Sequence, residues 1–398
     1  MSLLYDDILR EWEQEYAAIL HWWASYLPDQ QHGFHGEVNL NNEPVPDAHR
    51  GLVLYSRILW TFSTAIQNGY KDPFTALAAD AFQYLRNCFQ DTIHGGYYWS
   101  VTAKGAPYET HKQLYGQAFA LYAFAAYHAA TGNKEALVAA IDLFRLLEMH
   151  GLDPVSEGYW EARTASWQPL QGNRLSDKDP VVDKSMNTHL HILEAYTSLY
   201  AVWPDPDLQQ SIRSLLRIFQ THIIDPFSNS LHVYLAADWK PLSTHRSFGH
   251  DIEASWLLYE AATVLNDPLV VKQQAACSVQ MARAAISGLD ADGGMWNEFD
   301  PRTNHVDREK HWWPQAECIP GFLNAYQISG DTSFLNHALD AWNFIKNSIR
   351  HPTGEWIWGL DQQGAWIPSS KAGFWKCPYH NSRAMMEGIH RLKLIVEK

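Results

Sequence analysis

The chain is poor in charged residues and contains no long apolar run. Only 19% of its 398 residues are charged, and its formal net charge is −14. An acidic balance disfavours nucleic acid and anionic membranes as partners. No stretch of about 18 consecutive apolar residues occurs, so no segment is predicted to cross a membrane. The composition therefore argues against nucleic-acid-binding and membrane-spanning proteins.

Cysteine is also scarce, and no CxxC spacing occurs. This pattern predicts free thiols in a reducing compartment, without a disulfide framework or a zinc knuckle. Residues 1–7 lack a basic segment followed by an apolar run, so no signal peptide is predicted. We therefore expect a cytoplasmic protein. The four cysteines are Cys88, Cys277, Cys318 and Cys377.

The chain is instead rich in tryptophan and histidine. It contains 18 tryptophans and 20 histidines, and 46% of its residues are hydrophobic. Tryptophan faces stack well on the C–H faces of sugar rings, and large aromatic side chains also fill protein cores. We expect both uses here.

A glycine-aromatic segment recurs six times. The segments begin near residues 33, 95, 158, 229, 293 and 354, at intervals of about 61 to 71 residues. Apolar positions at helical spacing predict two helices for each unit. The predicted helices cover about residues 4–26, 48–68, 72–89, 110–131, 134–149, 183–202, 207–222, 250–265, 268–287, 313–328, 332–348 and 378–395.

Twelve helices in alternating inner and outer rings predict an all-α fold, an (α/α)6 barrel with short β-hairpins at one rim. The even-numbered helices are apolar on nearly all sides and suit the inner ring. No βαβ alternation and no Gly/Ser/Pro linker occurs, so we expect a single domain over residues 1–398. The longest interval contains a polar loop, 169–180, which we expect to cover the barrel mouth.

Polar residues on apolar inner helices are the candidates for chemistry. Arg57 lies in such a helix, where its guanidinium would form a structural ion pair or stabilise an oxyanion. His250 and Glu253 are three residues apart and share a helix face. His380 stands beside aromatic residues at the start of the last helix. Two histidines that face one cavity could exchange protons with opposite sides of one carbon.

Other residues at similar helix positions are candidates for a sugar-binding wall, although core packing explains the aromatic ones about equally well. Asn187 and His191 share a helix face, whereas His189 points elsewhere and is expected to be a satisfied core or surface histidine. Trp313 and Glu317 would place an aromatic ring beside a carboxylate. Two more aromatic candidates are Tyr115 and Trp256.

The residues alone leave three kinds of chemistry open. His191, His250, Glu253 and His380 are metal-ligand types, but no HExxH motif occurs. Two of the glutamates, from Glu37, Glu253 and Glu317, could be the carboxylates of a glycosidase. The third possibility is acid/base work by two histidines next to a carbonyl.

At these residues the chain resembles the N-acylglucosamine 2-epimerase superfamily, and within it the cellobiose 2-epimerases and mannose 2-epimerases. The resemblance runs almost from end to end. The matching segments are SRILW (56–60), KSMNTHLH (184–191), GHDIEA (249–254), WWPQAE (312–317) and WKCPYHN (375–381).

The resemblance implies a carbohydrate isomerase on an (α/α)6 barrel that needs no metal and no other cofactor. Its activity would invert C2 of a glucose or mannose unit, free or at the reducing end of a β-1,4-disaccharide, through an enediol. His250 and His380 would be the acid/base pair, Arg57 would hold the oxyanion, and Glu253 would orient His250. The sugar-site residues implied are Asn187, His191, Trp313, Glu317 and Trp375, together with Tyr115 and Trp256.

The substrate and three other activities stay open. Phe374 next to Trp375 is a candidate for shortening the site of a second sugar. An aldose–ketose isomerase that converts mannose to fructose would use the same histidines. A glycoside hydrolase and a pure binding protein are the further alternatives. We expect a small sugar as partner and a monomer or weak dimer.

Overall fold

The computed structural model describes residues 2–29, 33–172, 174–176 and 179–397. The two terminal residues of the predicted domain 1–398 lie outside the described residues, as do positions 173, 177 and 178 of the predicted loop 169–180.

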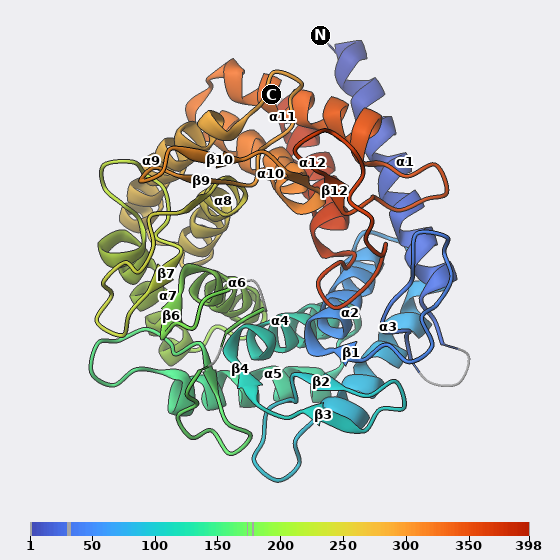
Figure 1. Cartoon of the computed structure of the whole chain (residues 1–398), viewed down its shortest axis with the longest axis vertical. Coiled ribbons are helices and arrows are strands. Elements are labelled where there is room, and N and C mark those ends of the chain that lie inside the picture. Colours follow the sequence, from blue (N-terminus) through green and yellow to red (C-terminus); the bar gives the residue numbers. More distant parts are fainter. Residues whose placement is uncertain (1, 30–32, 173, 177–178, 398) are drawn as a thin grey trace.

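Two concentric rings of helices make up the described part of the chain (Figure 1). Each inner helix packs against the next one, and the last inner helix packs against the first, which closes the ring. This arrangement is the predicted (α/α)6 barrel. The inner helices are α2 (Leu52–Gln67), α4 (Leu114–Thr131), α6 (Met186–Val202), α8 (Phe248–Val264), α10 (Trp312–Ser329) and α12 (Tyr379–Val396). The outer helices are α1 (Ser2–Tyr26), α3 (Phe74–Tyr84), α5 (Lys134–Leu146), α7 (Pro206–Ile218), α9 (Pro268–Ala285) and α11 (Thr332–Phe344).

The two rings differ in hydrophobic pattern as their positions require. In α2 every residue from Leu52 to Ala65 is buried, because the helix is covered by neighbours on all sides. The outer α7 buries one stripe, which includes Leu208, Ile212 and Leu215, and leaves its other face to solvent. An apolar surface on all sides therefore identifies the inner helices.

Most outer helices end in a wider turn. The helices α3, α5, α7 and α11 continue into π-helical turns, whereas α9 ends in a 3-10 turn, Ile286–Gly288. These turns explain why the predicted outer helices extend beyond the α-helical ends. The π-helical turns are Leu85–Phe89, Leu147–Gly151, Phe219–Ile223 and Ile345–Ile349.

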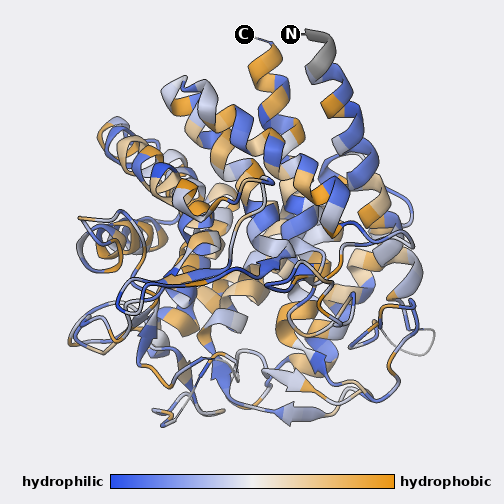
Figure 2. Cartoon of the chain, turned by 45° about the horizontal axis from the view of Figure 1, so that its top comes forward, coloured by the Kyte–Doolittle hydropathy of each residue, from blue (hydrophilic) through white to orange (hydrophobic). Residues whose placement is uncertain are grey.

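Short strands gather at one end of the barrel, away from the two termini (Figure 2). Successive strands form hairpins in two places, β2–β3 and β9–β10. The other pairs join a strand before an inner helix to a strand of the next unit, and a bridge from Val38 to Ala372 links the last unit to the first. Short antiparallel bridges such as Gln90–Tyr97 and Leu152–Tyr159 close further local hairpins in the glycine-aromatic segments. The prediction of short rim hairpins is thus confirmed, and the strand pairs between units add to them. The strands are β1 (Arg50–Gly51), β2 (Ser100–Val101), β3 (Pro107–Glu109), β4 (Lys112–Gln113), β5 (Ala162–Arg163), β6 (Lys184–Ser185), β7 (Tyr234–Leu235), β8 (Arg246–Ser247), β9 (Glu298–Asp300), β10 (His305–Asp307), β11 (Lys310–His311) and β12 (Gly359–Leu360).

A cation just before an inner helix pairs repeatedly with an acid from the preceding turn segment. We call these contacts the unit ion pairs. They tie five of the six inner helices, α2, α4, α6, α10 and α12, to the segment that follows the preceding outer helix. The pairs and their N–O distances are Arg50–Asp29 (2.6 Å), Lys112–Asp91 (2.8 Å), Lys184–Asp153 (2.8 Å), Lys310–Asp290 (2.8 Å) and Lys376–Glu355 (2.7 Å).

A second repeated contact anchors the glycine-aromatic segments to the inner helices. The side-chain oxygen of Gln117 accepts a hydrogen bond from the backbone N–H of Tyr97 at 2.8 Å. At the equivalent position of α6, His189 Nε2 accepts from the N–H of Tyr159 at 2.8 Å, and its Nδ1 bonds to the carbonyl of Ser185. His189 is thus confirmed as a satisfied core histidine.

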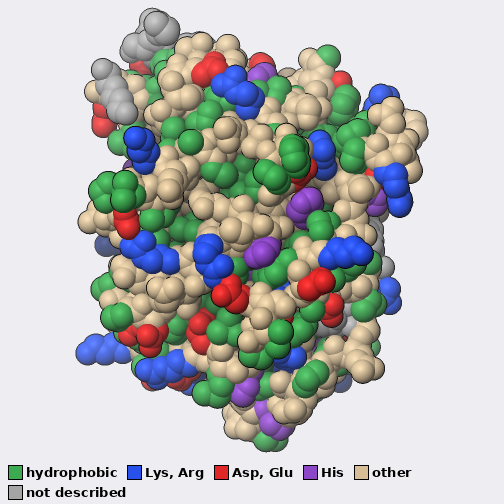
Figure 3. Space-filling model, turned by 90° about the vertical axis from the view of Figure 1, so that its left-hand side faces the viewer, with side chains coloured by type: hydrophobic (Ala, Val, Ile, Leu, Met, Phe, Trp, Pro, Cys, Tyr) green, Lys and Arg blue, Asp and Glu red, His purple; other side chains and the backbone are tan. Residues whose placement is uncertain are grey.

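The surface carries charges of both signs (Figure 3), and the helices were tested for membrane-spanning segments. On the face in Figure 3, lysines and arginines alternate with acidic and hydrophobic side chains. Within the described ranges, no helix is both long enough and apolar enough to span a bilayer.

Candidate functional site

The strand-bearing end of the barrel opens into a cavity of about 990 Å³. Its walls are the first turns of the inner helices and the rim strands. Nine of the eleven site residues predicted from the sequence line it. They are Arg57, Tyr115, Asn187, His191, His250, Glu253, Trp313, Trp375 and His380.

The two candidate acid/base histidines lie on either side of one aromatic ring. His250 and His380 occupy the first turns of α8 and α12, and Trp313 comes from the first turn of α10 between them. The ring centroids of His250 and Trp313 are 4.6 Å apart, and those of Trp313 and His380 are 5.6 Å apart. The geometry therefore brings two imidazoles to one cavity, as predicted.

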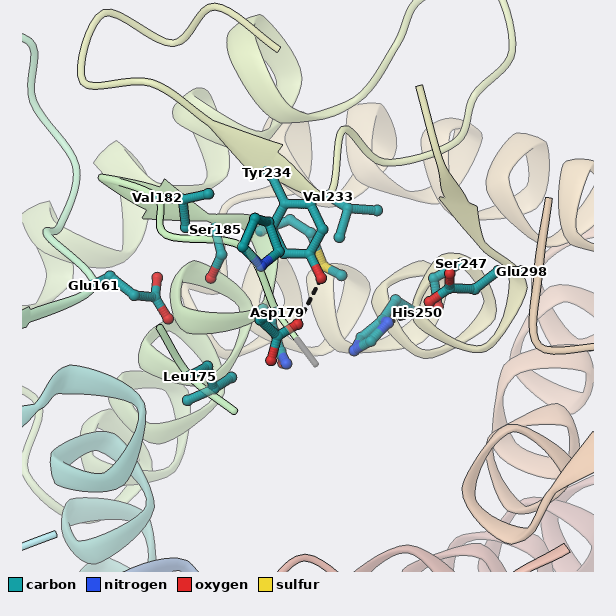
Figure 4. Close-up of a pocket in the computed structure, with 13 residues that line it drawn as sticks. Glu161, Leu175, Asp179, Val182, Ser185, Val233, Tyr234, Ser247, His250 and Glu298 are labelled. Atoms are coloured by element: carbon teal, nitrogen blue, oxygen red, sulfur yellow. Dashed lines mark hydrogen bonds between the residues drawn. The ribbon is translucent and has the colours of Figure 1, made fainter. Parts of the chain in front are cut away.

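Different groups stand behind the two imidazoles. His380 Nδ1 lies 2.7 Å from a carboxylate oxygen of Glu317, whereas His250 Nδ1 lies 2.7 Å from the hydroxyl oxygen of Ser247. Figure 4 shows His250 directed toward the side of the cavity that holds Asp179, with Ser247 behind it. In each case Nε2 is left for a ligand in the cavity.

The prediction that Glu253 orients His250 is wrong. Ser247, at the N-terminus of α8, lies one turn before His250 and reaches its Nδ1 first. The carboxylate of Glu253 points across the barrel and accepts a hydrogen bond of 2.6 Å from Arg383 on α12.

Six residues at equivalent positions, one from each inner helix, form a layer across the barrel, and Arg57, His191 and Glu253 of this layer line the cavity. Arg57 is stacked over Phe119, with its guanidinium carbon 4.2 Å from the ring centroid, and Phe119 is 4.7 Å from His191. On the opposite side, one nitrogen of Arg383, Nη2, donates to both Glu253 and Glu317 at 2.6 Å. On one side, this layer therefore holds Arg57, which forms no ion pair among the described residues. On the other side, it holds the ion-pair cluster of Arg383, Glu253 and Glu317.

Arg57 is positioned for an anionic ligand. Its Nη2 donates to the hydroxyl of Tyr115 at 2.8 Å, and its Nη1 lies 3.2 Å from the sulfur of Cys377. In the described part of the chain no carboxylate pairs with it, and its Nε has no hydrogen-bond partner. A buried guanidinium without an anion is a ready partner for an oxyanion.

Arg383 and Glu194 are two site residues that were not predicted from the sequence. The guanidinium of Arg383 contacts Glu253, Glu317 and Glu194, and the residue is 1% exposed. Glu194 holds His191 through Nδ1 at 2.9 Å. The signal was available, since both are charged residues on apolar inner helices, the same feature that marked Arg57.

Two predicted sugar contacts lie beneath the cavity wall instead. Glu317 is fully buried behind His380, and it accepts a hydrogen bond from the indole N–H of Trp256 at 3.1 Å. Trp256 is itself stacked against Arg383, 4.8 Å from its guanidinium carbon. Neither residue lines the cavity, because His380 covers Glu317 and Trp256 packs against Arg383.

Phe374 does not line this cavity. It packs against Trp99, with ring centroids 5.0 Å apart, and covers Gly51, where an added Cβ would lie 2.5 Å from its ring. Phe374 lines a neighbouring hollow of about 490 Å³, which shares Leu175, Ser176 and Trp375 with the cavity. That Phe374 shortens a second-sugar site stays a prediction.

Part of the loop 169–180 forms one wall of the cavity. Leu175, Ser176, Asp179 and Pro180 line it. The hydroxyl of Tyr234 donates to Asp179 at 2.5 Å, as the dashed line in Figure 4 marks. The described residues of this loop therefore contribute to the cavity wall, and the covering of the mouth stays a prediction.

Burial keeps the cavity histidines neutral. It lowers the pKa of His250 to about 3. It also holds the pKa of His380 well below the usual range, and the positive charges of Arg57 and Arg383 add to the effect. Burial lowers the pKa of His191 too, although Glu194 opposes the shift. At neutral pH each ring therefore has a lone pair that can accept a proton.

Glu253, Glu317 and His380 are close enough to ligate one metal ion, since their ligand atoms lie within 4.8 Å of one another. The guanidinium of Arg383 already donates to both carboxylates. These donors therefore fit an arginine better than a metal ion, because a second cation would meet its positive charge at close range.

Sequence and structure comparisons identify the family of the chain. A sequence model of the N-acylglucosamine 2-epimerase family matches residues 33–384. Cellobiose 2-epimerase from Bacteroides fragilis is 41% identical, and the alignment covers 96% of this chain and 99% of that protein. The structure of cellobiose 2-epimerase from Spirochaeta thermophila superposes with a TM-score of 0.92 at 38% identity, covering 98% of each chain.

A more distant relative is an isomerase. D-mannose isomerase from Marinomonas mediterranea is 24% identical over 87% of this chain and 88% of that protein. Because the family model and the two cellobiose 2-epimerases span most of the chain, the protein belongs to the N-acylglucosamine 2-epimerase family of carbohydrate epimerases and isomerases.

Proposed function

We propose that the protein inverts C2 of the reducing-end glucose or mannose unit of a β-1,4-linked disaccharide of the cellobiose type. The observation that carries the proposal is the pair of imidazoles, His250 and His380, on either side of Trp313 in one cavity. Two bases placed around one carbon can remove a proton from one face and return a proton to the other.

We infer the role of each histidine in the first proton transfer from the group that contacts its Nδ1. The carboxylate of Glu317 can only accept, so His380 carries its proton on Nδ1 and offers a lone pair at Nε2. His380 is thus set to act as a base toward C2 of the open-chain sugar. The hydroxyl of Ser247 both donates and accepts, so His250 can hold either protonation state. A negative intermediate beside His250 raises its affinity for a solvent proton, which it then gives to the other face.

Arg57 stabilises the intermediate. Removing the C2 proton of an aldehyde leaves an enediolate whose charge rests on oxygen. The guanidinium of Arg57 lines the cavity and is held by Tyr115, so it is preorganised for that charge. A single preorganised donor of this kind is worth about 10²- to 10³-fold in rate.

The size and lining of the cavity favour a disaccharide over a free hexose. Its volume of about 990 Å³ is at the upper end of the range for drug-sized ligands, roughly 300 to 1,000 Å³. Trp375 and Trp358 line it away from the helix floor, where a second ring can stack. The similarity to two cellobiose 2-epimerases, at 41% and 38% identity, supports the same substrate class.

The arrangement of Glu253 and Glu317 speaks against a glycoside hydrolase that uses these two carboxyl groups. Such enzymes place two carboxyl groups about 5 to 10 Å apart on opposite sides of the sugar. Here Glu253 and Glu317 share one nitrogen of Arg383, and Glu317 lies behind His380.

We also propose that the chain forms a single domain, since the inner helices form one closed ring.

The test is NMR of the protein with cellobiose, and separately with mannose, in D2O. We expect deuterium at C2 of both epimers, with faster exchange for the disaccharide. The variants His250→Ala and His380→Ala should each lose exchange while keeping the wild-type circular dichroism spectrum. A ketose as the main product would move the assignment to an aldose–ketose isomerase, and full exchange in either variant would remove that histidine from the mechanism.

A further inference from the structure

The cluster beneath the cavity has more acids than bases. Glu194, Glu253 and Glu317 surround the single guanidinium of Arg383, and all four side chains are nearly or fully buried. The second buried cation of this layer is Arg57, whose charge also reaches His380. Three ionised carboxylates beside two guanidinium groups would leave one uncompensated negative charge in a low-dielectric interior, which is costly. One carboxyl group is therefore expected to retain a proton.

The hydrogen bonds show which two groups are ionised. Glu317 accepts from His380 and Arg383 through one oxygen and from Trp256 through the other. Glu194 accepts from His191, Tyr379 and Arg383. A carboxyl group with three donors pointing at it has no place for a proton of its own and is stabilised as the anion.

Glu253 differs from both. Among the described side chains, only Arg383 donates to it, through the oxygen Oε1. The nearest other donor, His380 Nδ1, lies 3.9 Å away, beyond hydrogen-bond distance, and is already engaged by Glu317. Glu253 also lines the cavity, so its second oxygen faces the ligand space. It is the only member of the cluster that combines a free oxygen with access to the substrate.

The surrounding charges agree with this assignment. Charged and titratable groups surround Glu253 on four helices. They are Arg383, His380 and Tyr379 on α12, Glu317 on α10, Glu194 on α6 and Tyr115 on α4. Burial and the negative charge of Glu317 raise the pKa of Glu253, and Arg383 only partly opposes the shift. Burial raises the pKa of Glu317 as well. Because the two carboxyl groups share one nitrogen, they titrate as a pair, and the proton resides on the one with fewer donors.

We propose that Glu253 is a neutral carboxylic acid in the working protein and donates a hydrogen bond to the sugar oxygen that becomes negative in the enediolate. The inference rests on the proposed function for the identity of that oxygen. The proton stays on Glu253, so no bond is formed or broken there. A buried carboxylic acid kept neutral is an effective donor to an enolate oxygen, and here it acts together with Arg57.

The first test is independent of turnover. Infrared difference spectroscopy of the resting protein, wild type minus Glu253→Gln, should show the C=O stretching band of a carboxylic acid at neutral pH. In the wild type the same band should disappear when the pH is raised above the pKa of Glu253. Absence of the band in both measurements would overturn the proposal even if the protein proves to be an epimerase.

The second test compares two pairs of variants with the disaccharide. Glu253→Gln keeps a neutral donor and should retain kcat within about tenfold, whereas Glu253→Ala should lose about 10²- to 10³-fold. At Glu317, which is ionised, Gln and Ala should be equally damaging. The alkaline limb of the rate profile that reports Glu253 should vanish in Glu253→Gln. If Glu253→Gln is as inactive as Glu253→Ala, the carboxylate is the working form and the proposal fails.

Discussion

At the scale of single residues, the two imidazoles are distinguished by their partners. A carboxylate holds His380 in one tautomer, while the hydroxyl of Ser247 adapts to either form of His250. The pairing of a fixed base with an adaptable one suits a reaction that runs in both directions, since each histidine must both take and give a proton.

Ser247→Ala should therefore slow turnover without abolishing it. The imidazole of His250 would lose one hydrogen bond, worth about 0.5 to 1.5 kcal/mol, so kcat should fall up to about tenfold. KM should change little, because Ser247 acts through His250. Steady-state kinetics with the disaccharide measure both constants. Ser247→Thr keeps the hydroxyl and should restore most of the rate, and equal losses in the two variants would contradict this role.

The site residues that could be read from the sequence are those marked by their own type and position. Arg57 and His250 stand out as polar residues in apolar helices, and both line the cavity. What could not be read is which group each one meets. Glu253 and Glu317 are equivalent positions on neighbouring helices, yet one faces the cavity and the other lies behind His380. That difference depends on His380, which covers Glu317 from α12 and leaves Glu253 open to the cavity.

At the scale of elements, the unit ion pairs hold the rim to the helices. Each joins a residue just before an inner helix to a residue that follows an outer helix, so their loss should loosen a whole unit. Lys112 and Asp91 are 0% and 2% exposed, and the positive charge is also 4.9 Å from the ring of Tyr98. Removing one partner of such a pair leaves the other charge buried and uncompensated.

Lys112→Met should lower the free energy of unfolding by about 3 to 5 kcal/mol. Urea denaturation followed by circular dichroism measures the change. The matched control is Arg217→Met, which breaks an ion pair with Glu157 whose side chains are 49% and 60% exposed. That variant should lose at most about 1 kcal/mol. Equal losses in the two variants would show that burial does not set the strength of these pairs.

The helices were predictable and the strand pairing was not, for a physical reason. Apolar positions at helical spacing repeat over several turns, so α8 and α10 can be located to within a few residues. The rim strands are two or three residues long, too short for an alternating pattern. Strands β4 and β5 also lie in different units, and no local turn signals that they pair.

At the scale of the whole molecule, the barrel repeats one contact with different side chains. Gln315 donates to the carbonyl of His311, four residues earlier, and accepts from the backbone N–H of Met295 in its turn segment. His189 makes the same two contacts from α6. The two side chains therefore fulfil one structural role, but only the histidine can take up a proton.

Acid should destabilise the barrel through its buried neutral histidines. Burial lowers the pKa of His189 to about 4, while an unfolded histidine titrates near 6.5. The unfolded chain therefore binds more protons than the folded one between about pH 6.5 and 4. Stability is complete above the unfolded pKa and falls as the pH drops through this window, by at most about 1.4 kcal/mol per pH unit for each such histidine.

His189→Gln separates this proton effect from the structural contact. The variant copies Gln315, so at pH 7 its free energy of unfolding should stay within about 1 kcal/mol of the wild type. Between pH 6.5 and 4 its stability should fall less steeply, because one proton-binding group is gone from the unfolded chain. Urea denaturation at several pH values measures both quantities. A parallel decline in the two proteins would mean that His189 is not held neutral by the barrel, and that His191, His250 and His380 carry the acid sensitivity.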